Sequence, residues 1–239
     1  MSEKKPLKVL IINRKEDDRQ EWLTLPTDAD KVRALFDRLG IEPVTDRPKA
    51  AYYISATENL PFPELDDVIG KYDTIDGLNW LVSRLETMDE TEFATVQAAM
   101  AVGSYYRLQD VIALTYNTEF YVLLQNVHNE ADLGRYYLHD SGMVQMPEEW
   151  KAGIDTYRFG AHIMEQEKGR FSLQGYLVES GDEWKEVDRA HIPEEYRAEF
   201  GKPTPAKEKQ SIRGALKHTG QPGKDATTKP KTKHHGPEL

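Results

Sequence analysis

Every aromatic residue of this chain lies among its first 200 residues. Residues 201–239 are instead rich in Lys, Gly, Pro and Thr, and they bury too little apolar area to offset an ordering entropy of about 1–2 kcal/mol per residue. The sequence therefore predicts a folded body that ends near residue 200, followed by a disordered basic tail over residues 201–239. A chain of 239 residues has the length of one or two domains.

The charge divides at the same place. Residues 201–239 hold nine Lys and Arg against three Asp and Glu, so the first 200 residues hold 22 basic and 38 acidic residues, a formal charge of −16. Such a surface repels phosphate, so we expect no direct nucleic-acid binding by the body, no membrane docking, and at most weak DNA binding by the basic tail. The chain has no Cys, which excludes disulfides and thiolate metal sites. Its charged start lacks the apolar core of a signal peptide, which predicts a cytoplasmic protein.

Strand patterns dominate the first 60 residues. Short apolar or alternating runs predict strands at Val9–Ile12, Glu21–Pro26 and Ala51–Ala56, the first two forming a hairpin. Thr27 lies three residues before Asp30, as in a capping box, so a helix is expected to begin there. The order strand–strand–helix–strand predicts an N-terminal α+β subdomain over residues 1–60.

Helical periodicity dominates the following hundred residues. Short helices are expected at Ile75–Leu85, Phe93–Met100 after a capping box of Asp89 and Glu92, Leu108–Ile112, Phe120–Leu124, Leu133–Tyr137, Glu148–Gly153 and Tyr157–Gln166. The alternation of Arg170–Glu179 predicts a final strand or hairpin arm. We therefore expect an α+β fold with a central acidic helical subdomain over residues 61–125, and a C-terminal helical subdomain with a terminal strand over residues 126–200.

Sequence motifs for catalysis are absent. The chain contains no glycine-rich phosphate loop, no HExxH and no GxSxG, so we predict no enzyme activity, no catalytic residue, no metal and no cofactor. Glu183–Lys185 and Glu149–Lys151 each fit half of a metal-nuclease pattern, which keeps a carboxylate–metal nuclease as an alternative.

Acidic residues are densest between residues 58 and 100, where ten Asp and Glu stand against Lys71 and Arg84. One interpretation is a solvated helix face. The other is mimicry of a nucleic-acid backbone, which needs only the roughly 6–10 phosphate contacts that a DNA-binding protein makes. The residues alone leave both open.

Several spaced motifs resemble the ArdA antirestriction family in order over about residues 7–180. They are Val9–Asn13, Glu21–Pro26, Leu60–Phe62, Tyr72–Asn79, Asp132–Gly142, Pro147–Trp150, Ile154–Tyr157, Phe159–Gly160 and Gly169–Tyr176. The resemblance implies an elongated α+β protein of three small subdomains, usually a homodimer, carried by mobile genetic elements of bacteria. It also implies a non-enzymatic inhibitor that imitates bent DNA and occupies the DNA-binding groove of type I restriction–modification enzymes.

The implied DNA-mimic surface consists of the acids outside the apolar helix faces. These are Asp66, Asp67, Asp73, Asp76, Glu86, Asp89, Glu90, Glu92, Asp110, Glu119, Glu130, Asp132, Asp140, Glu148, Glu149 and Asp155. The balanced charge of the first 60 residues and the basic tail depart from the family pattern. They leave another defence nuclease or a CRISPR-type effector as an alternative target.

Overall fold

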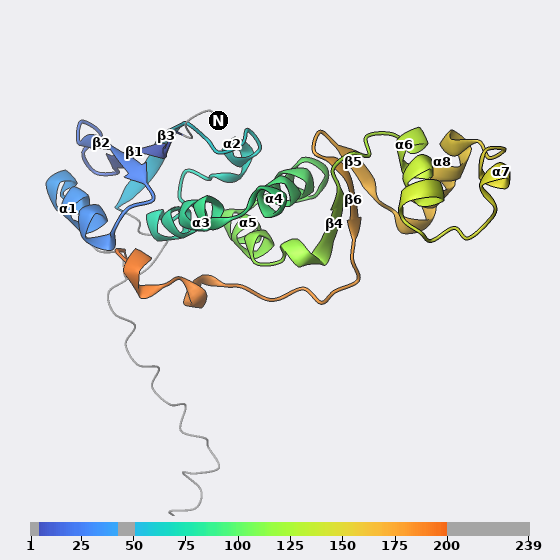
Figure 1. The fold of residues 1–239 in the computed structure, drawn as a ribbon. Helices are drawn as coiled ribbons and strands as arrows, with labels where there is room; N and C mark the ends of the chain where they lie inside the picture. Colours follow the sequence, from blue (N-terminus) through green and yellow to red (C-terminus); the bar gives the residue numbers. More distant parts are fainter. Residues whose placement is uncertain (1–4, 43–50, 200–239) are drawn as a thin grey trace, which may run out of the picture. The chain divides into compact units, whose positions relative to one another are not determined.

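A computed structural model of the chain describes residues 5–42 and 51–199. The described residues belong to one compact unit, Met1–Gly201, whose elements are coloured along the sequence in Figure 1. The predicted tail over residues 201–239 lies outside the described residues.

The N-terminal part is a three-stranded antiparallel sheet with one helix. Strands β1 (Leu7–Asn13), β2 (Gln20–Leu25) and β3 (Tyr52–Glu58) lie in the order β2-β1-β3, which confirms the three expected strands and the hairpin. Alternate residues of β1 point into the core, so the strand buries one complete face.

Helix α1 (Ala29–Leu39) confirms the expected helix but not its predicted start. Its N-cap residue is Asp28, not Thr27. The backbone of Thr27 is instead held by Asn79, whose side-chain oxygen accepts from the Thr27 N–H at 2.7 Å and whose amide donates to the Thr27 carbonyl at 2.6 Å. A contact 52 residues away in sequence thus fixes the entry to this helix. Gly40, with φ +67°, ends the helix.

Four helices follow the first sheet. They are α2 (Leu65–Val68), α3 (Ile75–Thr87), α4 (Glu90–Val102) and α5 (Leu108–Thr115). The capping box of α4 is confirmed, because Asp89 accepts from the Glu92 N–H at 2.8 Å and Glu92 accepts from the Asp89 N–H at 3.2 Å. The short helix α2 was not predicted.

The helix expected at Phe120–Leu124 is wrong. A 3-10 turn (Thr118–Phe120) leads into strand β4 (Tyr121–Leu124). This strand pairs with β6 (Gly175–Glu179), and β6 pairs on its other edge with β5 (Arg170–Ser172). Five consecutive apolar residues are too few to separate a period of 2 from one of 3.6, and the strand is fixed by a partner more than 50 residues away. The predicted terminal hairpin is confirmed.

Three helices lie between β4 and β5. They are α6 (Glu130–Arg135), continued by a π-helical turn (Tyr136–Asp140), α7 (Glu148–Lys151) and α8 (Thr156–Glu167), which confirms the expected helices. Helices α6 and α8 approach so closely that a Cβ on Gly134 would lie 1.9 Å from the Thr156 carbonyl oxygen. Glycine is therefore required at this contact.

The sequence predicted no individual helix or strand for the segment Ser180–Glu199, which we call the C-terminal strap. It leaves β6 and returns past α5 to the amino-terminal end of α3, as the orange trace in Figure 1 shows. It contains two 3-10 turns, Arg189–His191 and Glu194–Tyr196, and no longer element.

Two hydrophobic clusters form the interior. The larger one runs from the first sheet through α3, α4 and α5, and it includes Ile192 and Ala198 of the strap. The smaller one, centred on Val127, Leu133 and Tyr176, lies beneath α6 and α8. Within the described residues no helix is long and apolar enough to span a membrane.

Candidate interaction surface

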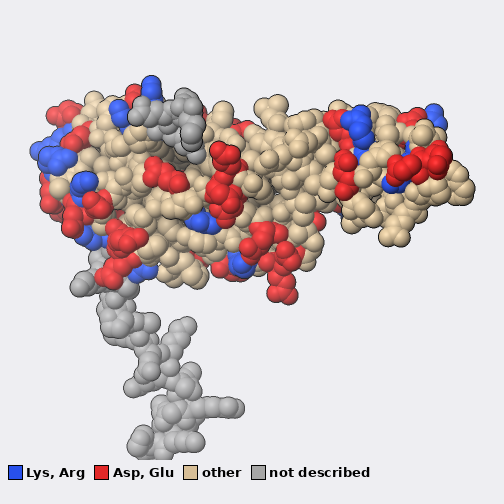
Figure 2. Space-filling model, viewed as in Figure 1, with Lys and Arg blue, Asp and Glu red and all other residues tan. Residues whose placement is uncertain are grey.

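The structure places most of the predicted acids at the surface. Ten of the sixteen are exposed: Asp66, Asp67, Glu86, Asp89, Glu90, Glu119, Asp140, Glu148, Glu149 and Asp155. Five are half-buried: Asp73, Glu92, Asp110, Glu130 and Asp132. On the face drawn in Figure 2, acidic side chains gather in several groups, with uncharged surface between them.

Asp76 is the exception, and its predicted place on the surface is wrong. Its exposed fraction is 0%, and its carboxylate accepts from the backbone N–H groups of Ala198 at 2.9 Å and Glu199 at 3.2 Å. The helical pattern of α3 put Asp76 on the polar side, but the C-terminal strap covers that side. Asp76 therefore holds the strap and offers no charge to a partner.

Several of the surface acids are paired with a base three residues away in the same element. Asp110 pairs with Arg107, Asp132 with Arg135, Glu148 with Lys151, and Asp155 with Arg158, at 2.7–3.7 Å. The hydrogen bond from Lys151 lowers the pKa of Glu148. These pairs reduce the local negative charge without joining one helix to another.

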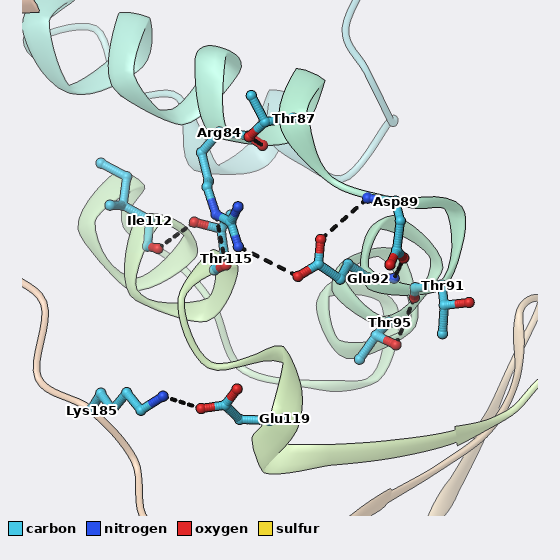
Figure 3. A network of polar contacts seen from close by, with 10 residues as sticks. All are labelled: Arg84, Thr87, Asp89, Thr91, Glu92, Thr95, Ile112, Thr115, Glu119 and Lys185. Carbon is cyan, nitrogen blue, oxygen red and sulfur yellow. Dashed lines mark hydrogen bonds and ion pairs between the residues drawn. The ribbon is translucent and has the colours of Figure 1, made fainter.

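Glu92 combines a surface position with a structural task (Figure 3). It closes the capping box of α4 and forms an ion pair with Arg84 of α3 at 3.5 Å. Arg84 in turn donates to the Thr115 carbonyl of α5 at 3.3 Å and lies over the Tyr116 ring. This carboxylate therefore helps to join three helices. Glu119, drawn in the same view, is paired with Lys185 of the strap.

A smaller set of acids is exposed and forms no ion pair with any residue that the structure describes. Its members are Asp66, Asp67, Glu86, Asp89, Glu90, Asp140 and Glu149. Asp66 accepts from the Thr57 hydroxyl and Asp89 caps α4, whereas the other five carboxylates form no side-chain hydrogen bond or ion pair with the described residues. We call this set the unpaired acids, because no described base compensates their charge.

The strap adds exposed acids that the sequence-based list did not include. They are Asp182, Glu183, Glu186, Asp188, Glu194 and Glu195. No helical or strand periodicity runs through this segment, so no pattern assigned these residues to a surface. The sequence signal that could have identified these surface acids is their density, six acids in fourteen residues.

The paired tyrosines of the C-terminal part belong to packing. Tyr136 and Tyr137 are half-buried against the smaller cluster, with their rings edge to face at 5.4 Å. The Tyr137 hydroxyl donates to Glu167, and burial together with this carboxylate raises the tyrosine pKa. Burial, and after it the same carboxylate, raise the pKa of Tyr176 to about 12. These phenols are therefore neutral hydrogen-bond donors that stabilise the helix pair.

The geometry needed by a carboxylate–metal nuclease does not occur in the described part of the chain, where no three Asp, Glu or His side chains converge on a possible metal position. In the Glu183–Lys185 pattern, Trp184 packs edge to face on Phe120 at 5.3 Å. The backbone of Lys185 is held by the Asn117 side chain. The pattern thus serves to anchor the strap.

Comparison with known families bears on the resemblance. The chain matches the family model of the antirestriction protein ArdA over residues 18–178. The chain belongs to the ArdA family. The match covers about two thirds of the sequence, from β2 into β6, and ends before the strap and the tail. ArdA proteins are antirestriction proteins that act as inhibitors and not as enzymes, so the membership confirms the antirestriction role inferred from the motifs. A search of curated proteins finds no match.

Proposed function

We propose that this ArdA protein inhibits type I restriction–modification complexes by presenting its acidic surface to their DNA-binding groove. The observation that supports this proposal is the set of unpaired acids, whose charge is not compensated by any described base. Together with a formal charge of −16 over the first 200 residues, they give a basic groove the kind of field that it meets in DNA.

The number of charges matches the task. A protein that binds DNA neutralises on the order of 6–10 phosphates, and the unpaired acids supply seven carboxylates before the strap is considered. Surface charges interact weakly one at a time, with about 0–1 kcal/mol for an exposed pair, so inhibition rests on many of them together. The proposal therefore predicts a distributed surface in which no single carboxylate is essential.

A fourfold variant tests this directly. Asp67→Asn, Glu86→Gln, Glu90→Gln and Glu149→Gln remove four unpaired charges without removing a hydrogen bond or ion pair that the structure shows. We expect DNA cleavage by a purified type I complex to be inhibited about 30-fold less well, since four charges at the middle of the range of about 0–1 kcal/mol each sum to about 2 kcal/mol. The melting temperature should stay unchanged.

The matched control changes four acids of the N-terminal part. Glu16, Asp28, Asp30 and Glu58 each form an exposed ion pair with a nearby base, so their amides alter the net charge equally at another place. If both fourfold variants lose inhibition equally, overall charge rather than this surface matters. If the protein inhibits no type I complex but blocks DNA binding by another defence nuclease or a CRISPR-type effector, the same scaffold has a different target.

We further propose that the protein acts as a homodimer, in which two copies extend the acidic surface. Light scattering of the purified full chain at micromolar concentration tests this part independently. A mass of about 55 kDa, twice the chain mass of 27.4 kDa, is expected. A mass of 27.4 kDa, that of a single chain, at micromolar concentration would refute the homodimer.

A further inference from the structure

Several contacts attach the first half of the C-terminal strap to the body. Trp184 packs on Phe120, and the Asn117 side chain donates to the Lys185 carbonyl at 2.9 Å and accepts from its N–H at 2.7 Å. Gln109 then donates to the Val187 carbonyl at 2.7 Å. These contacts fix the strap along α5 and the turn that follows it.

The second half of the strap enters the larger core. Ile192 is 3% exposed and Ala198 is 6% exposed, and the hydroxyl of Tyr196 lies 2.6 Å from that of Ser83 on α3. A cavity of about 530 Å³ lies between the middle of the strap and helices α3 and α5, lined on the strap side by Asp188–Ala190 and Ile192. The strap is therefore held at both ends and loosely packed in its middle.

The end of the strap is locked by two buried carboxyl groups that hold each other's backbone. Asp76 accepts from the N–H groups of Ala198 and Glu199. Glu199, itself 2% exposed, accepts from the N–H groups of Ile75 and Asp76 at the start of α3, and from the Tyr52 hydroxyl. Three elements, β3, α3 and the strap, thus meet at one reciprocal hydrogen-bonded site.

Two carboxyl groups buried at one site, each bonded to the other's backbone, resist carrying two negative charges at once. We propose that Glu199 is a proton-operated latch, which holds the strap closed when its carboxyl group is protonated and favours opening of the strap when it is ionised. The closed latch fixes the strap's exposed acids against the body.

The groups that face Glu199 support this assignment. Burial and the neighbouring charge of Asp76 raise the pKa of Glu199 to about 7, against smaller lowering effects of Tyr52 and the α3 amides. Arg197, the base two residues before Glu199 in the strap, donates to the Ile192 and Ala190 carbonyls. Tyr52, whose own pKa is raised by burial and by Glu199, stays a neutral donor.

The direction of the pH effect follows from the raised pKa. Below the ordinary pKa of 4.5, Glu199 is protonated whether the strap is closed or open, and closure has its full stability. As the pH rises, the open strap ionises first, and stability of the closed state is lost until the pH passes about 7. Between pH 5.5 and pH 8, the opening constant should rise about 25-fold.

Amide hydrogen exchange of the full chain, followed by mass spectrometry and corrected for intrinsic rates, tests the latch. Peptides from residues 180–199 should lose about 25-fold in protection from pH 5.5 to pH 8, while peptides from β1 should change less than threefold. Glu199→Gln, which removes the titratable group but keeps an acceptor, should reduce the change in the strap to less than threefold. Glu195→Gln, at an exposed strap position, should retain the full wild-type change.

Two results would overturn the latch. One is wild-type strap protection that varies less than threefold over this pH range, whatever the variants do. The other is an unchanged pH dependence in Glu199→Gln. If Glu199→Gln instead leaves the strap open at every pH, the wild-type protein and Glu195→Gln decide the outcome. A loss of strap protection of about 25-fold in both of them supports the latch, because Glu199 is the strap acid buried at the contact.

Discussion

Gly160→Ala should destabilise the helix pair α6–α8, although alanine is the better helix former. A Cβ at residue 160 would lie 1.8 Å from the Glu130 carbonyl oxygen and 2.7 Å from the Gly134 nitrogen. The first distance is about 1.6 Å short of an ordinary contact, and both neighbours are backbone atoms that cannot rotate away. The two helices must therefore move apart.

The magnitude follows from two opposing terms. Replacing Gly by Ala inside a helix stabilises by about 1 kcal/mol, whereas overpacking costs about 1–3 kcal/mol and more where backbone must shift. Because the clash involves the backbone of the facing helix, we expect a net loss of about 2 kcal/mol. For a domain of about 200 residues this lowers the melting temperature by about 4–8 °C.

Thermal unfolding followed by circular dichroism measures this loss, and hydrogen exchange locates it. Protection should fall in α6 and α8 more than in β1, because the smaller hydrophobic cluster beneath these helices has few buried members. Gly153→Ala is the matched control, since its Cβ would meet nothing closer than 3.5 Å. A Gly160→Ala protein as stable as the Gly153→Ala protein would refute the argument from close backbone contact.

Further outcomes can be checked with the same protein. Inhibition of a type I complex should weaken steeply between 50 and 500 mM NaCl, because screening shortens the reach of surface charge to about 3–4 Å near the upper limit; equal inhibition at both salts would argue against an electrostatic surface. Asp76→Asn should lower the pH at which strap protection falls, because it removes a charge that raises the Glu199 pKa, and an unmoved transition would contradict this. Truncation after Val178 should lower stability by about 3 kcal/mol or more, since Ile192 and Ala198 leave the core, whereas truncation after Phe200 should leave the melting temperature unchanged; equal melting of the two truncated proteins would contradict the structural role of the strap. The single substitution Glu86→Gln should change inhibition less than about fivefold, and complete loss with an intact fold would indicate a localised site.

The elements with local signals were predicted correctly. The capping box of Asp89 and Glu92 predicted the start of α4, and both hydrogen bonds of this capping box form. The short apolar and alternating runs at β1 and β2 predicted the hairpin. In each case the information lies within a few residues, so it is readable before the chain is folded.

The errors arose where contacts between residues far apart in the sequence determine the local structure. Phe120–Leu124 became a strand because β6 offers it a partner. Asp76 became buried because a segment more than 100 residues later covers the polar side of α3. The strap itself has no periodicity, since its side chains alternate irregularly between core, cavity and solvent. Most surface acids, in contrast, were placed correctly, because charge alone keeps most of them in water.

The local ion pairs have a consequence for the evolution of this protein. Among the residues that the structure describes, eight of the thirteen ion pairs join residues three apart within one segment, so few of them connect one element to another. Apart from Glu148, which also pairs with His139, the acids of these pairs form no ion pair or side-chain hydrogen bond outside their own segment among the described residues, so removing such an acid breaks no long-range contact. Lineages can therefore redraw the charge pattern residue by residue while the fold persists, and an inhibitor can follow a defence enzyme whose groove is itself changing.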